Sequence, residues 1–472
     1  MTVQKNIHPT VDSLRDQIVG LETPVPLLDG SSRAYINFDN GASTPALRGV
    51  VEKVDQLMET YASIHRGAGF KSLVSSRAYE QAHQIVLDFV GGDPRTDVVI
   101  FGKNTTEATN TLAAVTPWEQ DDVVLCSVME HHSNDLPWRE YARVVYIGMD
   151  ADGQLDMNDY VSKLRQHAGH VRLVAVTGAS NVTGFIPPVY AMAELAHRYG
   201  TRILVDSAQL APHRAIHKGA AGEPRTLDFL TLSGHKMYAP YGTGALIGPK
   251  DYFEQMPPQM RGGGTIEMVT QDEVYWAASP ERNEAGSPNV AGAVALAASL
   301  RILSAVGMDA VAQHEKELTG HILRRLREVD RLRVIGSADP ERLDDRLGVI
   351  AFNLDGVHHS LVAAILAYEG GIGVRNGCFC AHPYILRLLN VSGETYRDFR
   401  GRVLSGDRSD LPGLVRVSFG CYNTLEEIDT LVEWLQRIRA GDFRGEYILD
   451  RRSGSYAPRG WDEAQVELAY SL

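Results

Sequence analysis

Lys236 lies at a position where a lysine has few purely structural roles and where its amine can take part in chemistry. It follows the apolar run 227–232, and a Ser-Gly pair ends that predicted strand, so the lysine projects from the strand's end. A second apolar run, 203–205, leads directly into Asp206. Open α/β sheets bind their ligands at the carboxyl ends of their strands. We therefore expect the Lys236 amine and the Asp206 carboxylate to face the same site.

These two residue types together indicate one kind of cofactor chemistry. A lysine amine can form a Schiff base with an aldehyde, and an aspartate can keep a pyridine nitrogen protonated, which are the protein's contributions to pyridoxal 5'-phosphate (PLP) chemistry. A lysine in a solvated loop is the ordinary alternative, and the aspartate at the end of a neighbouring strand argues against it. We predict that PLP is attached at Lys236 and that Asp206 contacts its pyridinium nitrogen.

A family resemblance extends this prediction. The segments Asp206-Ser-Ala-Gln209 and Ser233-Gly-His-Lys236 resemble those of class V fold-type I PLP enzymes, above all group II cysteine desulfurases and selenocysteine lyase-like proteins. The resemblance covers about residues 35–438. It implies an α/β large domain with a mostly parallel sheet, a smaller α+β C-terminal domain, and a homodimer with shared active sites.

The resemblance also implies where the phosphate of PLP binds. Thr105 and Thr106 occupy a turn between a predicted strand and a predicted helix, where backbone N–H groups can bind an anion. Ser233 and His235 would complete the phosphate site from the lysine loop. Ser287 matches a position that in relatives reaches the phosphate of the neighbouring subunit, and the expected dimer depends on it.

Three further residues are assigned to the PLP ring by the resemblance. His131 would stack on the ring and lie near the substrate carbon for proton transfer. Asn181 would contact the ring hydroxyl or the substrate carboxylate, and Gln209 the ring oxygen. His131 and His132 could otherwise be half of a metal site, but no third ligand follows nearby, so we expect no metal.

Four basic residues are candidates for binding an amino-acid substrate. Arg416 alternates with the apolar residues of a predicted strand, so it lies on the other strand face. The resemblance makes it the clamp for the α-carboxylate, a task to which a guanidinium is suited. Arg375 precedes the cysteine loop, and His65 and Arg66 form a second cationic cluster that also matches the family.

The segment Arg375-Asn-Gly-Cys378-Phe-Cys380-Ala contains the candidate nucleophile. In group II desulfurases an Arg-x-Gly-x-x-Cys-Ala segment carries the catalytic cysteine, and Cys380 matches that position. The Cys-Phe pair before it departs from that pattern and resembles molybdenum-cofactor sulfurases. More residues separate Arg416 from Cys380 than is usual in the group. A charged insertion at about 395–411 is expected beside the active-site entrance. A small buried thiol is the alternative role, above all for Cys378.

The leading hypothesis is PLP-dependent cleavage of the carbon-sulfur bond of L-cysteine or a cysteine derivative, with a sulfur-acceptor protein as partner. Three alternatives stay open. One is a C–S lyase that acts on an S-conjugated cysteine, and a second is an aminotransferase, epimerase or other class V lyase of secondary metabolism. The third, outside enzymes, is a scaffold protein that retains PLP.

Composition narrows the class of protein. The chain has 472 residues, and its 46 basic and 59 acidic residues give a net charge of −13, which argues against binding to nucleic acid or anionic membranes. No run approaches the roughly 18 apolar residues of a membrane span, and the first residues lack the features of a signal peptide. Its four cysteines suit a reducing compartment. We expect a cytoplasmic protein.

The pattern of elements predicts three parts. Residues 1–34 are expected to form an N-terminal arm that packs on the small domain. Strand and helix patterns alternate in 35–295, the expected PLP-binding domain, where Thr44 is a candidate N-cap for the first helix. Residues 296–472 would form the small domain, with a polar tail at 441–472.

Overall fold

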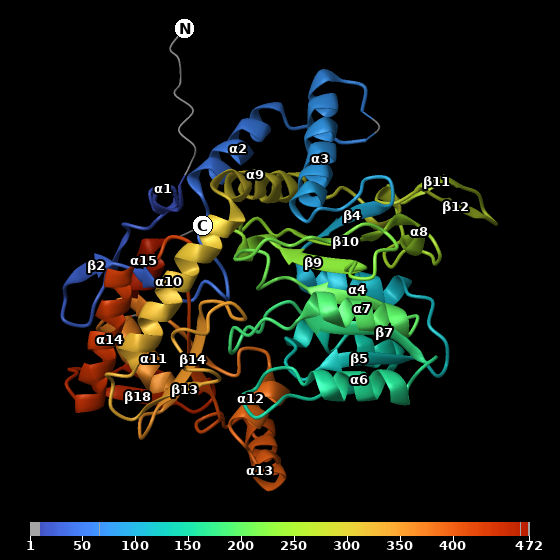
Figure 1. Cartoon of the computed structure of the whole chain (residues 1–472). Helices are drawn as coiled ribbons and strands as arrows, with labels where there is room; N and C mark the ends of the chain where they lie inside the picture. The colour runs from blue at the N-terminus through green and yellow to red at the C-terminus, as the bar shows by residue number, and fades with distance from the viewer. Residues whose placement is uncertain (1–9, 66, 463, 471–472) are drawn as a thin grey trace.

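The computed structural model describes residues 10–65, 67–462 and 464–470. Its largest sheet has seven strands in the order β4-β10-β9-β8-β7-β5-β6 (Figure 1). Only β10 runs antiparallel to its neighbours, so the sheet is mostly parallel. The strands are β4 (Asp97–Gly102), β5 (Val123–Ser127), β6 (Arg143–Ile147), β7 (Val171–Thr177), β8 (Arg202–Asp206), β9 (Phe229–Ser233) and β10 (Gly244–Pro249).

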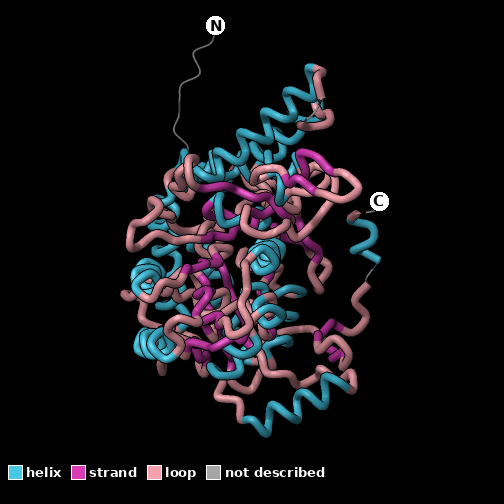
Figure 2. The backbone as a smooth tube through the Cα atoms, turned by 90° about the vertical axis from the view of Figure 1, so that its right-hand side faces the viewer, coloured by secondary structure: helices cyan, strands magenta, loops and turns pink. Residues whose placement is uncertain are grey.

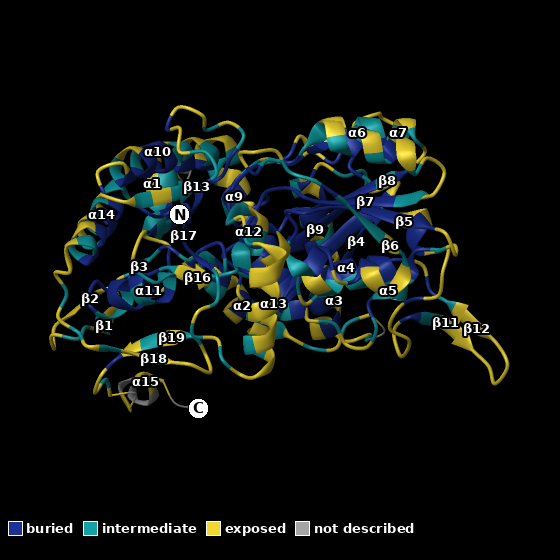
Figure 3. Ribbon diagram, turned by 90° about the horizontal axis from the view of Figure 1, so that it is seen from below, coloured by how far each residue is buried: buried dark blue, intermediate teal, exposed yellow. Residues whose placement is uncertain are grey.

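Helices cover both faces of this sheet, which is why its strands are almost continuously apolar (Figures 2 and 3). Strand β8 shows the division, because Leu204 packs with one set of helices while Ile203 and Val205 pack with the other. The first set is α4 (Thr105–Val115), α5 (Trp138–Tyr141) and α8 (Lys250–Phe253). The second set is α2 (Arg48–Thr60), α6 (Met157–Gln166), α7 (Val189–Arg198) and α9 (Val290–Val306), with α3 (Phe70–Phe89) packed on α9.

A second, antiparallel sheet has the order β13-β14-β17-β16. Its apolar side packs against helices that follow the large sheet in the chain, and these form a separate hydrophobic core. The predicted α/β fold with a smaller α+β C-terminal part is therefore confirmed. The elements are β13 (Leu332–Ile335), β14 (Val349–Leu354), β16 (Arg375–Gly377), β17 (Leu414–Ser418), α10 (Met308–Leu326), α11 (His359–Tyr368) and α14 (Leu425–Ala440).

Short elements connect the two sheets or lie at their edges. Among the described residues no single helix is both long and apolar enough to cross a membrane; α9 and α10 meet the two criteria only as a pair, with a bend of 78° between them. The remaining elements are α1 (Val11–Arg15), β1 (Pro24–Pro26), β2 (Ser32–Ala34), β3 (Ile36–Asn37), β11 (Ile266–Val269), β12 (Val274–Trp276), β15 (Ile372–Gly373), α12 (His382–Leu388), α13 (Gly393–Leu404), β18 (Tyr447–Asp450), β19 (Ser455–Pro458) and α15 (Ala464–Ala469), with single 3₁₀ turns η1 (His132–Asn134), η2 (Gly234–Lys236) and η3 (Glu281–Asn283).

Both ends of the described chain contact the smaller sheet's helices. The Arg15 side chain forms an ion pair with Glu427 at 2.8 Å and donates a hydrogen bond to the Tyr422 carbonyl. The β18–β19 hairpin of the C-terminal tail lies against α11, where Ser360 donates to the Gly454 carbonyl at 2.8 Å. The described part of the polar tail thus contains a hairpin followed by a short helix.

One predicted helix start is wrong. The first long helix begins at Arg48 with Leu47 as its N-cap, so Thr44 does not cap it. The Thr44 hydroxyl instead accepts a hydrogen bond from the Tyr238 N–H at 2.8 Å and donates to the His235 carbonyl at 3.2 Å. The residue therefore ties the early turn to the loop that carries Lys236.

Candidate active site

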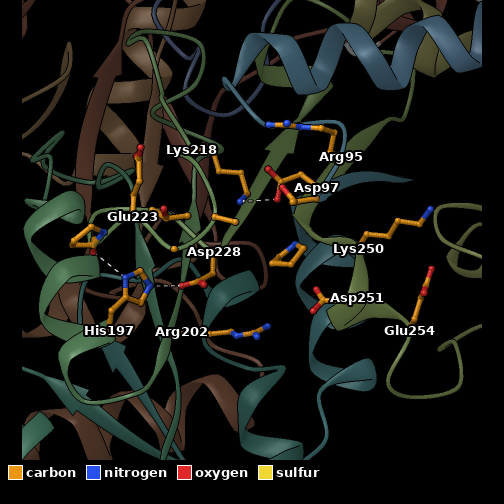
Figure 4. Close-up of a pocket in the computed structure, with 16 residues that line it drawn as sticks. Arg95, Asp97, His197, Arg202, Lys218, Glu223, Asp228, Lys250, Asp251 and Glu254 are labelled. Atoms are coloured by element: carbon orange, nitrogen blue, oxygen red, sulfur yellow. Dashed lines mark hydrogen bonds and ion pairs between the residues drawn. The ribbon is translucent and has the colours of Figure 1, made fainter.

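A cavity of about 640 Å³ lies away from the carboxyl ends of β8 and β9, where the site is expected. It is found where β4 and β8 begin and β10 ends (Figure 4). Four of its lining side chains form two pairs with one another. Lys218 Nζ lies 2.9 Å from Asp97 Oδ1, with both side chains almost fully buried, and His197 Nε2 lies 2.8 Å from Asp228 Oδ2. These pairs have the features of structural contacts.

The second cavity, of about 300 Å³, lies at the carboxyl ends of β8 and β9. It brings together most of the residues that the sequence predicts for a site. These are Thr105, Thr106, His131, Asn181, Asp206, Gln209, Ser233, His235, Lys236, Arg375, Cys380 and Arg416. Side chains that were predicted from segments more than 300 residues apart thus line one space.

Three predicted residues are not part of this cavity. His65 is exposed and its ring contacts Tyr79, with 6.2 Å between the ring centroids. Ser287 is also exposed and lies outside the cavity of its own chain. Arg66 lies outside the described residues. The predicted substrate role of His65 therefore has no support within one chain, while the role of Ser287 in a neighbouring subunit stays a prediction.

Lys236 and Asp206 project from adjacent strands. Asp206 pairs in register with Thr231 of β9, so the aspartate and the end of the lysine strand are neighbours. Burial lowers the pKa of the Lys236 amine to about 8, against the opposing effect of Asp206. No described residue accepts a hydrogen bond from this amine, which leaves it available as a nucleophile. Burial raises the pKa of Asp206, and an N–H donated by Ala208 at 3.0 Å opposes this.

The start of α4 forms an anion-binding turn beside the lysine loop. Asn104 caps the helix by accepting the Glu107 N–H, and the Thr105 N–H donates to the Ser233 hydroxyl at 3.0 Å. Within the described chain the Thr106 N–H has no acceptor, so one donor at the positive end of the helix stays free. Gly244 is required nearby, because a Cβ there would lie 2.5 Å from the Asn104 Cα.

His131 is held as a neutral ring. Burial, followed by the charges of Lys236 and neighbouring residues, lowers its pKa to about 3. The Ser133 N–H donates to His131 Nδ1 at 3.1 Å, so the proton of the neutral ring lies on Nε2. The Ser133 hydroxyl also lies 2.6 Å from the Thr106 hydroxyl, which links the histidine to the anion-binding turn.

Arg416 is buried, with its guanidinium stacked over the Phe379 ring at 5.0 Å. Its Nη1 donates to the Asn181 carbonyl at 2.9 Å and its Nη2 to Asp39 Oδ1 at 3.0 Å. The Nε atom is buried without a partner in the described structure. Arg416 also lines the cavity, where its planar cation suits an acceptor such as a carboxylate.

A tight turn presents Cys380 to the cavity. The Ala381 N–H donates to the Cys378 carbonyl at 2.8 Å, and the two central residues, Phe379 and Cys380, have φ of 47° and 54°. This is the pattern of a type I′ turn, which side chains other than glycine rarely adopt. The turn is held in place because the His132 N–H donates to the Cys380 carbonyl at 2.8 Å.

Cys378 faces away from that cavity. Its thiol donates to the Pro412 carbonyl at 3.1 Å, and burial raises its pKa to about 11. It lines a separate, largely apolar groove of about 230 Å³ between α12 and α13. The insertion at 395–411 forms much of α13 and borders this groove, while none of its residues lines the cavity that contains Cys380.

Several contributors to the site were not identified from the sequence. Asp39 is one of them, since it contacts both Arg375 and Arg416. Ser133 and Phe379 were overlooked. The signal for Ser133 was its place directly after the two histidines, whereas nothing in the order of residues connects Asp39 with arginines more than 300 positions away.

Comparison with known proteins agrees with this geometry. Residues 36–431 match the model of the family described as Aminotransferase class-V. A cysteine desulfurase of Haloferax volcanii is 34% identical over 93% of this chain and 99% of its own, and one of Dickeya dadantii is 35% identical over 91% and 97%. The solved apo structure of a cysteine desulfurase from Thermococcus onnurineus NA1 superimposes with a TM-score of 0.75 at 32% identity, covering 86% of this chain and 95% of that one.

The fold, the lysine at a strand end and these matches define a class. The chain belongs to the class V aminotransferase family, whose members are PLP enzymes. The predicted similarity to cysteine desulfurases is confirmed, and it extends over almost the whole length of the relatives.

Proposed function

We propose that this protein is a PLP-dependent cysteine desulfurase. One observation carries the proposal: Lys236, Asp206, Arg416 and Cys380 line a single cavity. An amine for the cofactor, a carboxylate for its ring, a cation for the substrate carboxylate and a thiol for sulfur are the groups that this reaction needs. The similarity to relatives named cysteine desulfurase supports the same function.

The residues present fit PLP. Lys236 has an unpaired amine of lowered pKa to attach the aldehyde, and Asp206 lies on the adjacent strand end for the ring nitrogen. The free Thr106 N–H and the hydroxyls of Thr105 and Ser233 form a donor set for a phosphate at a helix N-terminus. When bound, PLP would withdraw electrons from the substrate α-carbon.

Arg416 and Asn181 would bind the α-carboxylate of the amino acid. Both residues line the cavity, and the planar guanidinium of Arg416 suits a carboxylate. Because two of its nitrogens are already fixed by protein oxygens, the guanidinium cannot rotate freely. The substrate's orientation is therefore set by a rigid cation.

Lys236 and His131 would handle protons. With a pKa of about 8, about a tenth of the Lys236 amine is uncharged at pH 7, and an uncharged amine can take the α-proton. His131, which lines the cavity, remains neutral and holds its proton on Nε2. It would orient the substrate by hydrogen bonding without adding charge.

Cys380 would receive the sulfur. Its sulfur would form a bond with the substrate sulfur, the substrate C–S bond would break, and its electron pair would stay on the substrate carbon and take up a proton. The products are alanine and a persulfide on Cys380. The side chain is exposed, so a sulfur-acceptor protein or a small thiol can reach it.

Replacing Cys380 by serine tests the proposal. Alanine and sulfide formation from L-cysteine should be abolished while the absorbance of bound PLP persists. Cys378→Ser is the matched control and should retain activity, because Cys378 faces the other groove. Full activity of Cys380→Ser, together with faster turnover of S-substituted cysteines than of cysteine, would replace this function with a C–S lyase.

A further inference from the structure

Phe379 lies between two groups of the cavity that would act on the substrate. It directly precedes Cys380 in the chain, and its ring centroid lies 5.0 Å from Arg416 Cζ. All three side chains line the cavity. Only 8% of Phe379 is exposed, so its ring meets the guanidinium in a place from which water is largely excluded.

A closed set of contacts joins Phe379 to the predicted carboxylate site. Its carbonyl accepts a hydrogen bond from Asn181 Nδ2 at 2.7 Å, and the Asn181 carbonyl accepts one from Arg416 Nη1 at 2.9 Å. The contact between the ring and the guanidinium completes the set. The turn that presents the Cys380 thiol is therefore attached to Arg416 through both the backbone and the side chain of one residue.

The ring restricts a motion that the hydrogen bonds of Arg416 leave open. Bonds from Nη1 to Asn181 and from Nη2 to Asp39 hold two points of the guanidinium, so its plane can still tilt about the line between them. An aromatic face attracts a cation and stacks on a planar guanidinium, which opposes this tilt. A carboxylate accepts hydrogen bonds in the plane of the guanidinium, so a tilt would weaken its binding.

Packing is the alternative reason for an apolar residue at this position, because Phe379 is also part of the largest apolar core. Its backbone φ of 47°, however, places it in a turn conformation that favours glycine or asparagine. Packing into the core does not by itself require an aromatic ring there. A leucine or a methionine would keep most of the apolar contacts, and the two roles can therefore be separated by substitution.

We propose that Phe379 is a positioning residue for substrate binding: its ring fixes the plane of the Arg416 guanidinium and so strengthens the binding of amino acids through their α-carboxylate. This inference rests on the proposed function, in which Arg416 binds that carboxylate. It assigns to the ring an effect that depends on the carboxylate of the ligand, whereas the backbone of Phe379 shapes the turn of Cys380.

L-Alanine and L-alaninamide test this role, because the amide lacks the carboxylate and neither ligand requires sulfur chemistry. Their dissociation constants would be measured by calorimetry on the PLP-loaded protein, and the wild type should prefer alanine. In Phe379→Leu and Phe379→Met this preference should fall by about tenfold, within the range of a desolvated contact between a cation and an aromatic ring. Phe379→Tyr keeps the ring and should keep the preference.

Alkylation of Cys380 by iodoacetamide, followed by mass spectrometry on protein without substrate, shows whether the turn is retained. Leucine and methionine are unbranched at Cβ and apolar, so the rate of alkylation should match that of the wild type. A lower preference for alanine in these two variants, with unchanged alkylation and with the preference retained in Phe379→Tyr, supports the inference.

Four results would overturn the inference: no preference for alanine in the wild type, an equal loss of affinity for both ligands or an unchanged preference in the non-aromatic variants, a lower preference that comes with altered alkylation, or loss of the preference in Phe379→Tyr. Failure of the wild-type protein to release alanine from L-cysteine would overturn the proposed desulfurase function alone, because the comparison of the two ligands requires no sulfur release.

Discussion

The substitution Arg416→Lys tests whether the Arg416 guanidinium binds the substrate carboxylate. Arg416 donates hydrogen bonds to the Asn181 carbonyl at 2.9 Å and to Asp39 at 3.0 Å, and it lines the cavity in which the substrate carboxylate would lie. A lysine amine is shorter and lacks the planar fork that holds the guanidinium in this place. Loss of one charged hydrogen bond to the substrate carboxylate costs up to about 3 kcal/mol, or a loss of up to about 150-fold in kcat/KM.

The loss should appear mainly as a higher KM, because the α-carboxylate is bound equally before and during the reaction. Alanine production at increasing L-cysteine concentration, with saturating PLP, measures both constants. Arg375→Lys is the control. The side chains of Arg375 and Asp39 in its ion pair are 49% and 19% exposed, so kcat/KM should fall by less than about fivefold. The reasoning fails if Arg416→Lys keeps more than about a third of kcat/KM, or if Arg375→Lys is equally impaired.

Three further predictions concern titration and stability. PLP uptake by the apoprotein, followed by absorbance, should rise about tenfold per pH unit up to about pH 8 and then level off, because only the uncharged Lys236 amine reacts; a flat profile would contradict the lowered pKa. Lys218→Met should lower the free energy of unfolding in urea by about 3–5 kcal/mol, since it leaves Asp97 buried and unpaired, and adding Asp97→Asn should recover most of it. Burial opposes ionisation of Glu315, but a contacting histidine and arginine outweigh this effect and lower its pKa to about 2. The carboxylate therefore stabilises the fold fully above about pH 4.5, and this stabilisation is lost as the pH falls toward 2. The free energy of unfolding of Glu315→Gln should accordingly depend less on pH over that range than that of the wild type.

Residues at strand ends were predictable because the strands are regular. Apolar runs bounded by polar residues gave β8 and β9, and the rule that parallel strands end at one edge placed Asp206 beside Lys236. In β17 the alternation of polar and apolar residues predicted that Arg416 lies on the opposite strand face from its apolar neighbours. The structure buries this arginine, because its guanidinium stacks over the Phe379 ring and donates to the Asn181 carbonyl and to Asp39.

Contacts between distant turns were not predictable. Asp39 lies 377 positions from Arg416, and no periodicity relates a loop before α2 to a strand near the end of the chain. Thr44 failed as a helix cap for the same reason, since its hydroxyl is used by the Tyr238 N–H of a loop that is distant in sequence. Local signals of helix capping compete with such tertiary bonds, and the sequence alone does not show which will prevail.

The two cysteines of one short segment show how a turn determines function. Cys378 and Cys380 are separated by a single residue, so the local sequence does not distinguish their roles. The left-handed conformations of Phe379 and Cys380 reverse the chain, and the reversal directs one thiol toward Lys236 and the other into the apolar groove below α13. Because the His132 N–H holds the Cys380 carbonyl, the histidine motif positions the thiol as well as the ring beside it. Glycine at position 379 would allow this turn to relax, and it would also remove the ring on which Arg416 stacks, so Phe379→Gly should change both access to the thiol and the position of the guanidinium.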